Sequence, residues 1–409
     1  MGQQPERIVV LGAGHAGGSV VAFLRQYGWA GGITLVGAEP IVPYHRPPLS
    51  KAWLKGEADA ASLALRPGKF YADNAIELCL GTTAIAIDRQ AKTIALATGA
   101  SLAYDHLILA LGARARRLAI QGAELQGVLE LRTVADADRL KAVLGPGKTL
   151  AIIGGGYIGL EAAASARALG AEVCLIEREP RLLARVASAG LSAFFQGFHQ
   201  AKGVRFALNT GVTELIGKAG RVTAIRLSSG ASIPCDTALI GVGAVANDEL
   251  ARACGLACDD GIEVDLAART GDPSIYAIGD CTRRPLPRYG RMVRLESVPN
   301  AVEQAKQAAA SLCARPPPAP EVPWFWSDQY DLRLQIAGLA FDATETILRG
   351  DPATNRFAVF HLAADATVQA VEAVNAAPEF LGGKLLIASR RAVSRELLAD
   401  VAVSMKDLL

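Results

Sequence analysis

Two glycine-rich segments of the chain have the spacing of phosphate-binding loops. Gly12-Ala-Gly-His-Ala-Gly17 and Gly154-Gly-Gly-Tyr-Ile-Gly159 both fit the pattern G-x-G-x-x-G. In this pattern the first glycine permits a tight turn, the second lets the backbone approach a pyrophosphate, and the third lets a helix pack on a strand. The helix that follows offers free N–H groups and a partial positive charge to the phosphates. The chain is therefore predicted to bind two dinucleotides.

An acidic residue follows each loop at the distance where a ribose would lie. Glu39 comes after the first loop and Glu177 after the second. A carboxylate at this position accepts hydrogen bonds from a ribose diol, and at Glu177 it also repels a 2′-phosphate, which favours NAD(H) over NADP(H). Arg178, Arg181 and Arg185 lie close by in the sequence and weaken this preference.

A third segment, Thr270–Asp280, ends in Gly279-Asp280 after a predicted strand at 275–278. The glycine allows close approach of the backbone, and the carboxylate of Asp280 can accept a hydrogen bond from a ribityl hydroxyl. A chain that binds two such nucleotides is well suited to transfer hydride from a nicotinamide to a flavin. This segment therefore favours a flavin in one of the two sites.

The elements around the two loops have the order strand, loop, helix, strand. The first set is predicted at 7–11, 18–27 and 33–36, and the second at 149–153, 160–169 and 172–177. Apolar runs at 104–110 and 235–242 lead to Gly112 and Gly243, as expected for buried strands that leave a sheet. Two such βαβ units predict an α/β protein with two Rossmann-like dinucleotide-binding domains.

The last part of the chain is predicted to be a separate small α+β domain. Four prolines between 316 and 320 cannot lie within a helix or a central strand, so they indicate a stiff linker or a surface crossing. Two apolar runs beyond it, at 357–362 and 368–374, predict an antiparallel pair, and a helix is expected from about Pro378.

Composition excludes several classes of protein. Of 409 residues, 51% are hydrophobic and 20% are charged, which argues against disorder, and a net charge of +2 gives no argument for nucleic acid. No long apolar run predicts a membrane span, and the N-terminus is expected to be a first strand and not a signal peptide. The seven cysteines include no C-x-x-C pair, and the histidines have no metal-ligand spacing, so we expect no metal and a reducing, cytoplasmic setting.

Several further segments make the chain resemble the FAD-dependent NADH:ferredoxin reductases of bacterial oxygenase systems, of the putidaredoxin reductase and biphenyl dioxygenase reductase type. The two glycine loops and Gly279-Asp-Cys281 are shared with many flavin disulfide reductases. Narrower matches are Pro43-Tyr-His-Arg-Pro-Pro-Leu-Ser-Lys51, Glu296-Ser-Val-Pro-Asn-Ala301 and Trp324-Phe-Trp-Ser-Asp-Gln-Tyr330. The resemblance spans nearly the whole chain.

The resemblance implies a glutathione-reductase-like fold with three domains. The FAD-binding domain would comprise 1–112 and 240–318, the NAD-binding domain 113–239, and the C-terminal α+β domain 319–409. Together with the motifs, it implies that FAD is lined by Gly12, Gly14, Ala16, Gly17, Ala38, Glu39, Arg46, Pro48, Lys51, Ala84, Gly112, Arg132, Asp280 and Val298. The residues expected to contact NADH are Gly154, Gly156, Tyr157, Ile158, Gly159, Glu161, Glu177 and Gly243.

Three residues are expected to act at the flavin ring. By the resemblance, Lys51 lies beside the ring, where its charge can stabilise the reduced, anionic flavin. Glu161 reaches the same region and can pair with Lys51. Trp326 is expected near the flavin, although Trp324 and Trp326 can equally be aromatic anchors of the small domain.

The missing dithiol predicts the electron acceptor. Without a reactive cysteine pair, the reduced flavin has to pass its electrons onward directly, and the chain has no cysteine cluster for an iron–sulfur centre. We therefore expect a [2Fe-2S] ferredoxin as partner, with Arg66, Lys306 and Arg333 as docking residues, and a monomeric reductase of the EC 1.18.1 type. Two alternatives remain: an NADH oxidase or quinone reductase, and an apoptosis-inducing-factor-like protein that binds partners under the control of NADH.

Overall fold

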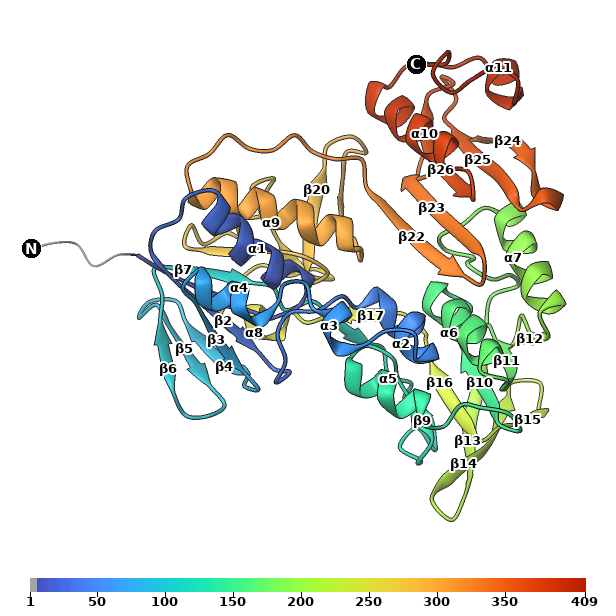
Figure 1. Cartoon of the computed structure of the whole chain (residues 1–409), viewed down its shortest axis with the longest axis horizontal. Coiled ribbons are helices and arrows are strands. Elements are labelled where there is room, and N and C mark those ends of the chain that lie inside the picture. Colours follow the sequence, from blue (N-terminus) through green and yellow to red (C-terminus); the bar gives the residue numbers. More distant parts are fainter. Residues whose placement is uncertain (1–5) are drawn as a thin grey trace, which may run out of the picture. The chain divides into compact units, whose positions relative to one another are not determined.

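The computed structural model describes residues 6–409, which form two compact units (Figure 1). The first unit contains the chain up to Arg46 together with Asp59–Arg114 and Val245–Glu321. The second contains Pro47–Ala58, Ala115–Ala244 and Val322–Leu409. Met1–Pro5, the first part of the segment judged not to be a signal peptide, lie outside the described residues.

A five-stranded parallel sheet in the order β19-β7-β1-β2-β3 forms the centre of the first unit. The strands are β1 (Arg7–Leu11), β2 (Gly32–Gly37), β3 (Ile76–Leu80), β7 (His106–Leu109) and β19 (Ile275–Ala277). Alternate residues of β1 face opposite sides, as the period of a strand requires. Ile8 and Val10 pack beneath α1 (His15–Gln26) and α9 (Val298–Leu312), whereas Val9 and Leu11 belong to the core on the other face.

Smaller elements complete the first unit. An antiparallel sheet of β4 (Ala84–Asp88), β5 (Thr93–Leu96) and β6 (Ser101–Ala103) contributes to the core on the second face of the parallel sheet. The remaining elements are α3 (Ala60–Leu63), α4 (Gly68–Asp73), α8 (Glu249–Ala253), β18 (Ile262–Glu263), β20 (Thr282–Leu286) and β21 (Arg291–Val293). Both faces of the parallel sheet are therefore covered, as is usual for such sheets.

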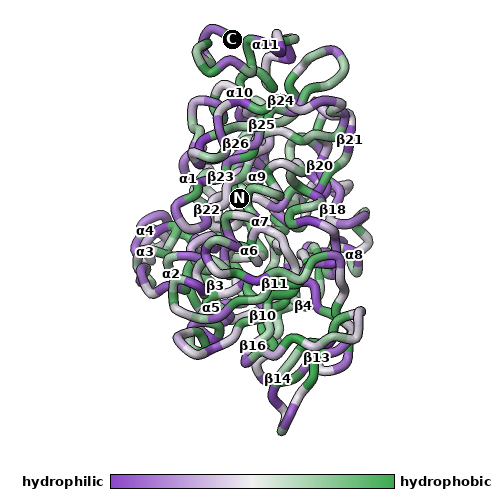
Figure 2. Tube along the Cα trace, turned by 90° about the vertical axis from the view of Figure 1, so that its right-hand side faces the viewer, coloured by the Kyte–Doolittle hydropathy of each residue, from purple (hydrophilic) through white to green (hydrophobic). Residues whose placement is uncertain are grey.

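The second unit repeats this plan with a parallel sheet in the order β12-β11-β10-β16-β9. Most residues of its strands are buried, and the strands labelled β10, β11 and β16 in Figure 2 are largely hydrophobic. The strands are β9 (Val128–Leu129), β10 (Thr149–Ile153), β11 (Glu172–Ile176), β12 (Val204–Ala207) and β16 (Thr237–Ile240). Around it lie α5 (Val134–Lys141), α6 (Tyr157–Ala168), α7 (Ala189–Ala201), β13 (Val212–Lys218), β14 (Arg221–Leu227) and β15 (Ser232–Pro234). The separate stretch Pro47–Ala58 adds a 3-10 turn, Pro47–Ser50, and α2 (Ala52–Lys55). The chain passes between the two units five times, and two of these crossings fall within β8 (Ala113–Ala115) and β17 (Ala244–Ala246).

The end of the chain forms a five-stranded antiparallel sheet in the order β22-β23-β26-β25-β24. Its elements are β22 (Trp324–Gln329), β23 (Leu332–Gly338), β24 (Glu345–Asp351), a 3-10 turn Pro352–Thr354, β25 (Arg356–Leu362), β26 (Val368–Val374), α10 (Ala377–Ser389) and α11 (Arg395–Ala399). Ala358 and Phe360 share a core with α10, whereas Phe357 and Val359 pack with residues of α6 and α7. This sheet is therefore part of the second unit.

The predicted fold class is confirmed, and most predicted elements are present. Strands 7–11 and 149–153 have the predicted bounds, and 357–362 and 368–374 fall in the antiparallel pair β25–β26 of a larger sheet. Both α1 and α6 begin three residues before the predicted start, because their N-caps are the loop glycines Gly14 and Gly156. The proline-rich stretch 315–320 has no regular secondary structure. The three-domain division stays a prediction.

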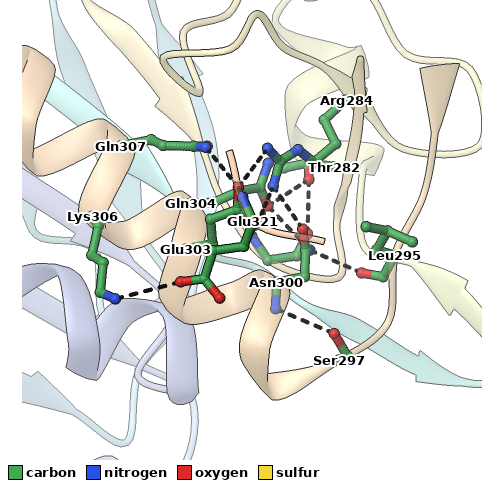
Figure 3. Close-up of polar contacts among 11 residues, drawn as sticks. Thr282, Arg284, Leu295, Ser297, Asn300, Glu303, Gln304, Lys306, Gln307 and Glu321 are labelled. Atoms are coloured by element: carbon green, nitrogen blue, oxygen red, sulfur yellow. Dashed lines mark hydrogen bonds and ion pairs between the residues drawn. The ribbon is translucent and has the colours of Figure 1, made fainter. Parts of the chain in front are cut away.

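A buried polar cluster ties β20 to α9 in the first unit (Figure 3). Arg284, only 2% exposed, donates from Nη1 to Glu303 Oε2 and to Asn300 Oδ1, both at 3.1 Å. Glu303 Oε1 also accepts hydrogen bonds from Gln307 Nε2 at 3.0 Å and from the backbone N–H of Glu321 at 3.1 Å. Removing one member of such a pair leaves an uncompensated charge in the core.

We therefore expect Glu303→Leu to lower the free energy of unfolding by about 3 kcal/mol or more, because Arg284 loses its counter-charge while buried. The double variant Arg284→Met/Glu303→Leu should lose less, since no charge is then left unpaired. Urea unfolding followed by circular dichroism measures both. A double variant less stable than Glu303→Leu would contradict the expectation.

Candidate active site

The first glycine loop is tightly packed at two positions and open at the third. A Cβ atom on Gly12, whose φ is +115°, would lie 2.1 Å from the carbonyl oxygen of Ala110, and one on Gly17 would lie 1.8 Å from that of Gly12. At Gly14 no described atom would come within 4 Å. Gly14 is also the N-cap of α1, where no described side chain makes a capping hydrogen bond. The start of α1 therefore borders open space, which is the arrangement that a pyrophosphate bound at a helix N-terminus requires.

The second loop has the same construction. A Cβ atom on Gly154 would lie 2.3 Å from the carbonyl oxygen of Gly241, and one on Gly159 would lie 2.3 Å from that of Gly154. A Cβ atom on Gly156 would again have no described atom within 4 Å, and no described side chain caps α6. Of the other residues predicted for this site, Ile158 is 48% exposed and Gly243 has a φ of +103° after β16.

The side chain of Glu177 is hydrogen-bonded to the second loop. Its Oε2 accepts a hydrogen bond from the N–H of Gly155 at 2.6 Å, and its Oε1 accepts one from the N–H of Glu179 at 2.9 Å. A carboxylate has about four lone-pair sites, so capacity remains for a ribose diol. The predicted ribose acceptor thus lies beside the predicted phosphate-binding loop.

Glu39 and Arg46, predicted separately, form an ion pair in the first unit. Arg46 Nη2 lies 2.8 Å from Glu39 Oε1, and Tyr44 donates its hydroxyl hydrogen to Glu39 Oε2 at 2.7 Å. Close by, His15 Nε2 and His45 Nδ1 lie 3.2 Å apart, which places the histidine of the first loop against the segment that carries Tyr44 and Arg46.

A buried side-chain amide that was not predicted from the sequence contacts the segment around Asp280. The N–H of Gly279 donates to Gln304 Oε1 at 2.8 Å, and Gln304 is fully buried on α9. In the part of the chain that the structure describes, Gln304 Nε2 has no hydrogen-bond partner. Ala16 lies beside Gly279, and Val298 is in the first turn of α9. The open space at Gly14 fits a bound dinucleotide.

The remaining residues predicted to line FAD are divided between the two units. Ala38, Ala84 and Gly112, whose φ is +64°, belong to the first unit. Pro48 and Arg132 belong to the second. Their contacts with a cofactor stay predictions.

Lys51 and Glu161 form a close ion pair in the second unit. Lys51 Nζ lies 2.6 Å from Glu161 Oε2, and the two side chains are 18% and 3% exposed. Ser50 donates its hydroxyl hydrogen to the same oxygen at 2.5 Å, and Ser327 on β22 donates to Glu161 Oε1 at 2.6 Å. The predicted pairing is confirmed, whereas the role of the pair at a flavin stays a prediction.

The aromatic residues of β22 lie on both faces of the strand. The ring centroids of Trp324 and Trp326 are 5.7 Å apart, and Trp324 also packs on Phe380 of α10 at 5.6 Å. On the opposite face, Phe325 packs on Tyr157 with ring centroids 4.6 Å apart. Trp324 and Phe325 therefore anchor the C-terminal sheet, and Trp326 stays a predicted flavin neighbour.

The three residues predicted to dock a partner lie on different elements. Arg66 and Arg333 are exposed, and the Lys306 side chain is 35% exposed. The ammonium of Lys306 lies 3.8 Å from Glu321 Oε1 and 5.9 Å from the centre of the Phe23 ring. Each has a charge available at the surface, and docking itself stays a prediction.

Comparisons with known proteins decide the family. Residues 6–305 match the pyridine nucleotide-disulphide oxidoreductases, and residues 324–409 match the reductase C-terminal family. The chain is 50% identical to a probable ferredoxin reductase of Castellaniella defragrans, covering 98% of each, and 41% identical to putidaredoxin reductase of Pseudomonas putida, covering 99% of this chain and 97% of the other. A solved structure of a covalent putidaredoxin reductase–putidaredoxin complex has a TM-score of 0.96 at 41% identity, covering 98% of each chain.

The chain belongs to the ferredoxin reductases of the pyridine nucleotide-disulphide oxidoreductase family. The resemblance and the enzyme class predicted from the sequence are thereby confirmed. All seven cysteines of the ferredoxin reductase lie among residues 6–409 and are unpaired. The same residues include no His/Cys/Asp/Glu cluster that could hold a metal ion, and none of their helices is long and apolar enough to cross a bilayer.

Four residues of the reductase site were not predicted: Ser50, Gln304, Ser327 and Gln329, whose amide nitrogen lies 3.1 Å from Ser327 Oγ. Ser327 and Gln329 stand two apart in Trp-Phe-Trp-Ser-Asp-Gln, so on a strand they share a face. Two polar residues on one face of a largely aromatic strand are a signal that they have a buried partner. The sequence offered no such signal for Gln304, which has alternating apolar and polar neighbours on a helix.

The packing of the second loop predicts opposite effects for two glycine-to-alanine changes. Gly159→Ala should destabilise the reductase, because its Cβ would overlap a backbone oxygen. Gly156→Ala should leave the thermal unfolding midpoint nearly unchanged but raise KM for NADH about tenfold or more, because the new methyl group occupies the space for the pyrophosphate. Thermal unfolding and steady-state kinetics with ferricyanide measure both. An unchanged KM in Gly156→Ala would place the nucleotide elsewhere.

Proposed function

We propose that this ferredoxin reductase transfers hydride from NADH to FAD and passes single electrons to a [2Fe-2S] ferredoxin that serves a monooxygenase or dioxygenase. The observation that carries the proposal is the presence of two loops with the same open geometry, one in each unit, in a chain related over its whole length to ferredoxin reductases. One loop suits FAD and the other suits NADH. Bound FAD supplies the step between a two-electron donor and a one-electron acceptor.

The residues of the first unit would hold FAD. The N–H groups at the start of α1 face the pyrophosphate, Glu39 offers an acceptor to the ribose, and Asp280 offers one to the ribityl chain. In the second unit, the ammonium of Lys51 would compensate negative charge on the reduced ring.

The residues of the second unit favour NADH over NADPH. Glu177 would accept hydrogen bonds from the ribose, and a 2′-phosphate there would meet its negative charge. Arg181 is committed to the chain itself, since its guanidinium donates to the carbonyl oxygens of Ala184 and Ala187 and to Ser192 Oγ at 2.6–2.8 Å. Arg178 pairs with Glu179 at 3.1 Å. Of the three nearby arginines, Arg181 is thus held by the chain itself, whereas Arg178, 81% exposed, is paired only at the surface.

The relatives and the cysteines support the proposed partner and the proposed cytoplasmic setting. A related reductase has been solved in complex with putidaredoxin, and we extend an iron–sulfur partner of this kind to the present chain. Burial raises the pKa of Cys235 and of Cys281 to about 12, so these thiols stay protonated and inert. Seven unpaired cysteines suit a reducing compartment such as the cytoplasm, and because both glycine loops lie in one chain the proposed enzyme needs no second copy and works as a monomer.

The function is tested with the purified protein. We expect a yellow protein whose flavin absorbance near 450 nm is bleached by NADH without oxygen, and whose colour returns on adding an oxidised [2Fe-2S] ferredoxin. Failure of NADH to bleach the flavin would overturn the proposal. Faster reoxidation by oxygen or a quinone than by any ferredoxin would favour an NADH oxidase or quinone reductase, and binding of partners without turnover would favour the apoptosis-inducing-factor-like alternative.

Charge reversal tests the docking residues separately. Arg66→Glu and Lys306→Glu should each slow ferredoxin reduction several-fold, and most at low salt, because electrostatic steering is screened as ionic strength rises. Turnover with ferricyanide should remain. Lys92→Glu, in the exposed turn between β4 and β5, is the charge-matched control. Equal slowing by all three changes would show a general effect of net charge and remove Arg66 and Lys306 from the docking site.

A further inference from the structure

A chain of buried hydrogen bonds extends from Glu161 into the core of the second unit. Ser327 on β22 is fully buried and contacts Glu161 Oε1 at 2.6 Å. Gln329, on the same face of β22 and 1% exposed, lies with its Nε2 3.1 Å from Ser327 Oγ. His199 on α7 is fully buried, and its Nε2 lies 2.8 Å from Gln329 Oε1. Four side chains from α6, β22 and α7 are thus connected in a row.

The chemistry of the groups sets the direction of every hydrogen bond in this row. The Glu161 carboxylate, ion-paired with Lys51, can only accept, so the Ser327 hydroxyl gives it its single hydrogen. Ser327 Oγ then accepts from the Gln329 amide nitrogen. The amide oxygen of Gln329 therefore accepts from an N–H at His199 Nε2. All donors point toward Glu161.

The state of His199 agrees with this direction. Burial lowers the pKa of His199 to about 4, so the ring is neutral near pH 7 and carries one proton. Among residues 6–409, His199 Nδ1 has no hydrogen-bond partner. A buried N–H without an acceptor is costly, so the proton belongs on Nε2, where Gln329 accepts it. Neutral groups that donate in series polarise one another and strengthen the last bond, the one to Glu161.

We propose that Ser327, Gln329 and His199 are positioning residues that hold the Glu161 carboxylate in place and, through it, the ammonium of Lys51. Lys51 and Ser50 both contact Glu161 Oε2, so among the described residues only Ser327 holds Oε1 and prevents rotation of the carboxylate. The role in hydride transfer rests on the proposed function, because it requires Lys51 to act at the flavin. The hydrogen-bond chain itself does not.

A matched pair of variants separates the hydroxyl from its packing. Threonine and valine have the same shape, and both suit a strand, but only threonine keeps the hydroxyl. We expect Ser327→Val to lower the rate of flavin reduction at saturating NADH about 10- to 100-fold, as displacement of a positioned group does, with little change in the Kd for NADH. Ser327→Thr should stay close to the wild type. Anaerobic stopped-flow absorbance measures both constants.

A double-mutant cycle shows whether the effect acts through Glu161. In the background Glu161→Gln, Ser327→Val should cost less than about twofold in the reduction rate, because the group that Ser327 positions is already altered. His199→Gln, which can place an amide N–H near the Nε2 position, should be milder than His199→Leu. A residue that matters only for folding would instead show additive losses.

A second measurement needs no electron transfer. Acylation of lysines by a small amine-reactive ester, read by mass spectrometry on the flavin-loaded protein, reports how firmly Lys51 is held. We expect Lys51 to react several-fold faster in Ser327→Val than in Ser327→Thr or wild type, with the exposed Lys148 and Lys202 unchanged.

The outcomes are distinct. Equal reduction rates and equal Lys51 acylation in Ser327→Val and Ser327→Thr, or additive losses in the cycle, would overturn the inference. A different result separates the two proposals. If Lys51 is acylated faster in Ser327→Val, but NADH does not bleach the flavin of the wild-type protein, the hydrogen-bond chain is upheld and the proposed function is overturned.

Discussion

A single buried carboxylate connects three parts of the second unit. Glu161 is 3% exposed, and a charge removed from water in this way is tolerated only where a counter-charge and hydrogen-bond donors surround it. Its partners come from two other parts of the sequence: Ser50 and Lys51 from the stretch Pro47–Ala58, and Ser327 from the C-terminal sheet. The need to satisfy one carboxylate therefore ties three distant segments together, and a second tie, from Ser165 Oγ to the carbonyl oxygen of Ser50, holds the same turn at 2.6 Å.

The rest of the binding chemistry is carried by backbone geometry. In both glycine loops the first and third glycines are fixed by contacts with carbonyl oxygens, and only the middle glycine faces open space. The predicted phosphate sites therefore lie at the N-termini of α1 and α6, where the helix dipole favours an anion. The two loops have the same backbone geometry, but the acidic residues beside them have different partners. Glu39 contacts the side chains of Arg46 and Tyr44, whereas Glu177 accepts hydrogen bonds from backbone N–H groups.

The parts of this architecture that depend on local sequence were predictable, and those that depend on long-range contacts were not. The parallel strands β1 and β10, the two loops and the acids that follow them each occupy a short stretch with its own pattern. The pairing of Lys51 with Glu161 could be anticipated only through the family resemblance, since 110 positions separate them. The partners of Glu161 in β22 and the contact of Gln304 with Gly279 require the folded chain, because a polar residue in an apolar stretch does not identify its partner.

The order of segments along the chain has a consequence for synthesis on the ribosome. The central strand β1 can pair with β2 and β7 early, but the edge strand β19 and the helix α9 that packs with α1 come after Ala115–Ala244, a stretch that belongs to the other unit. At about 5–20 residues per second, that insertion delays completion of the first sheet by on the order of 10 s. During this interval the apolar face that α9 later covers is exposed on the nascent chain, so chaperone binding is most needed then.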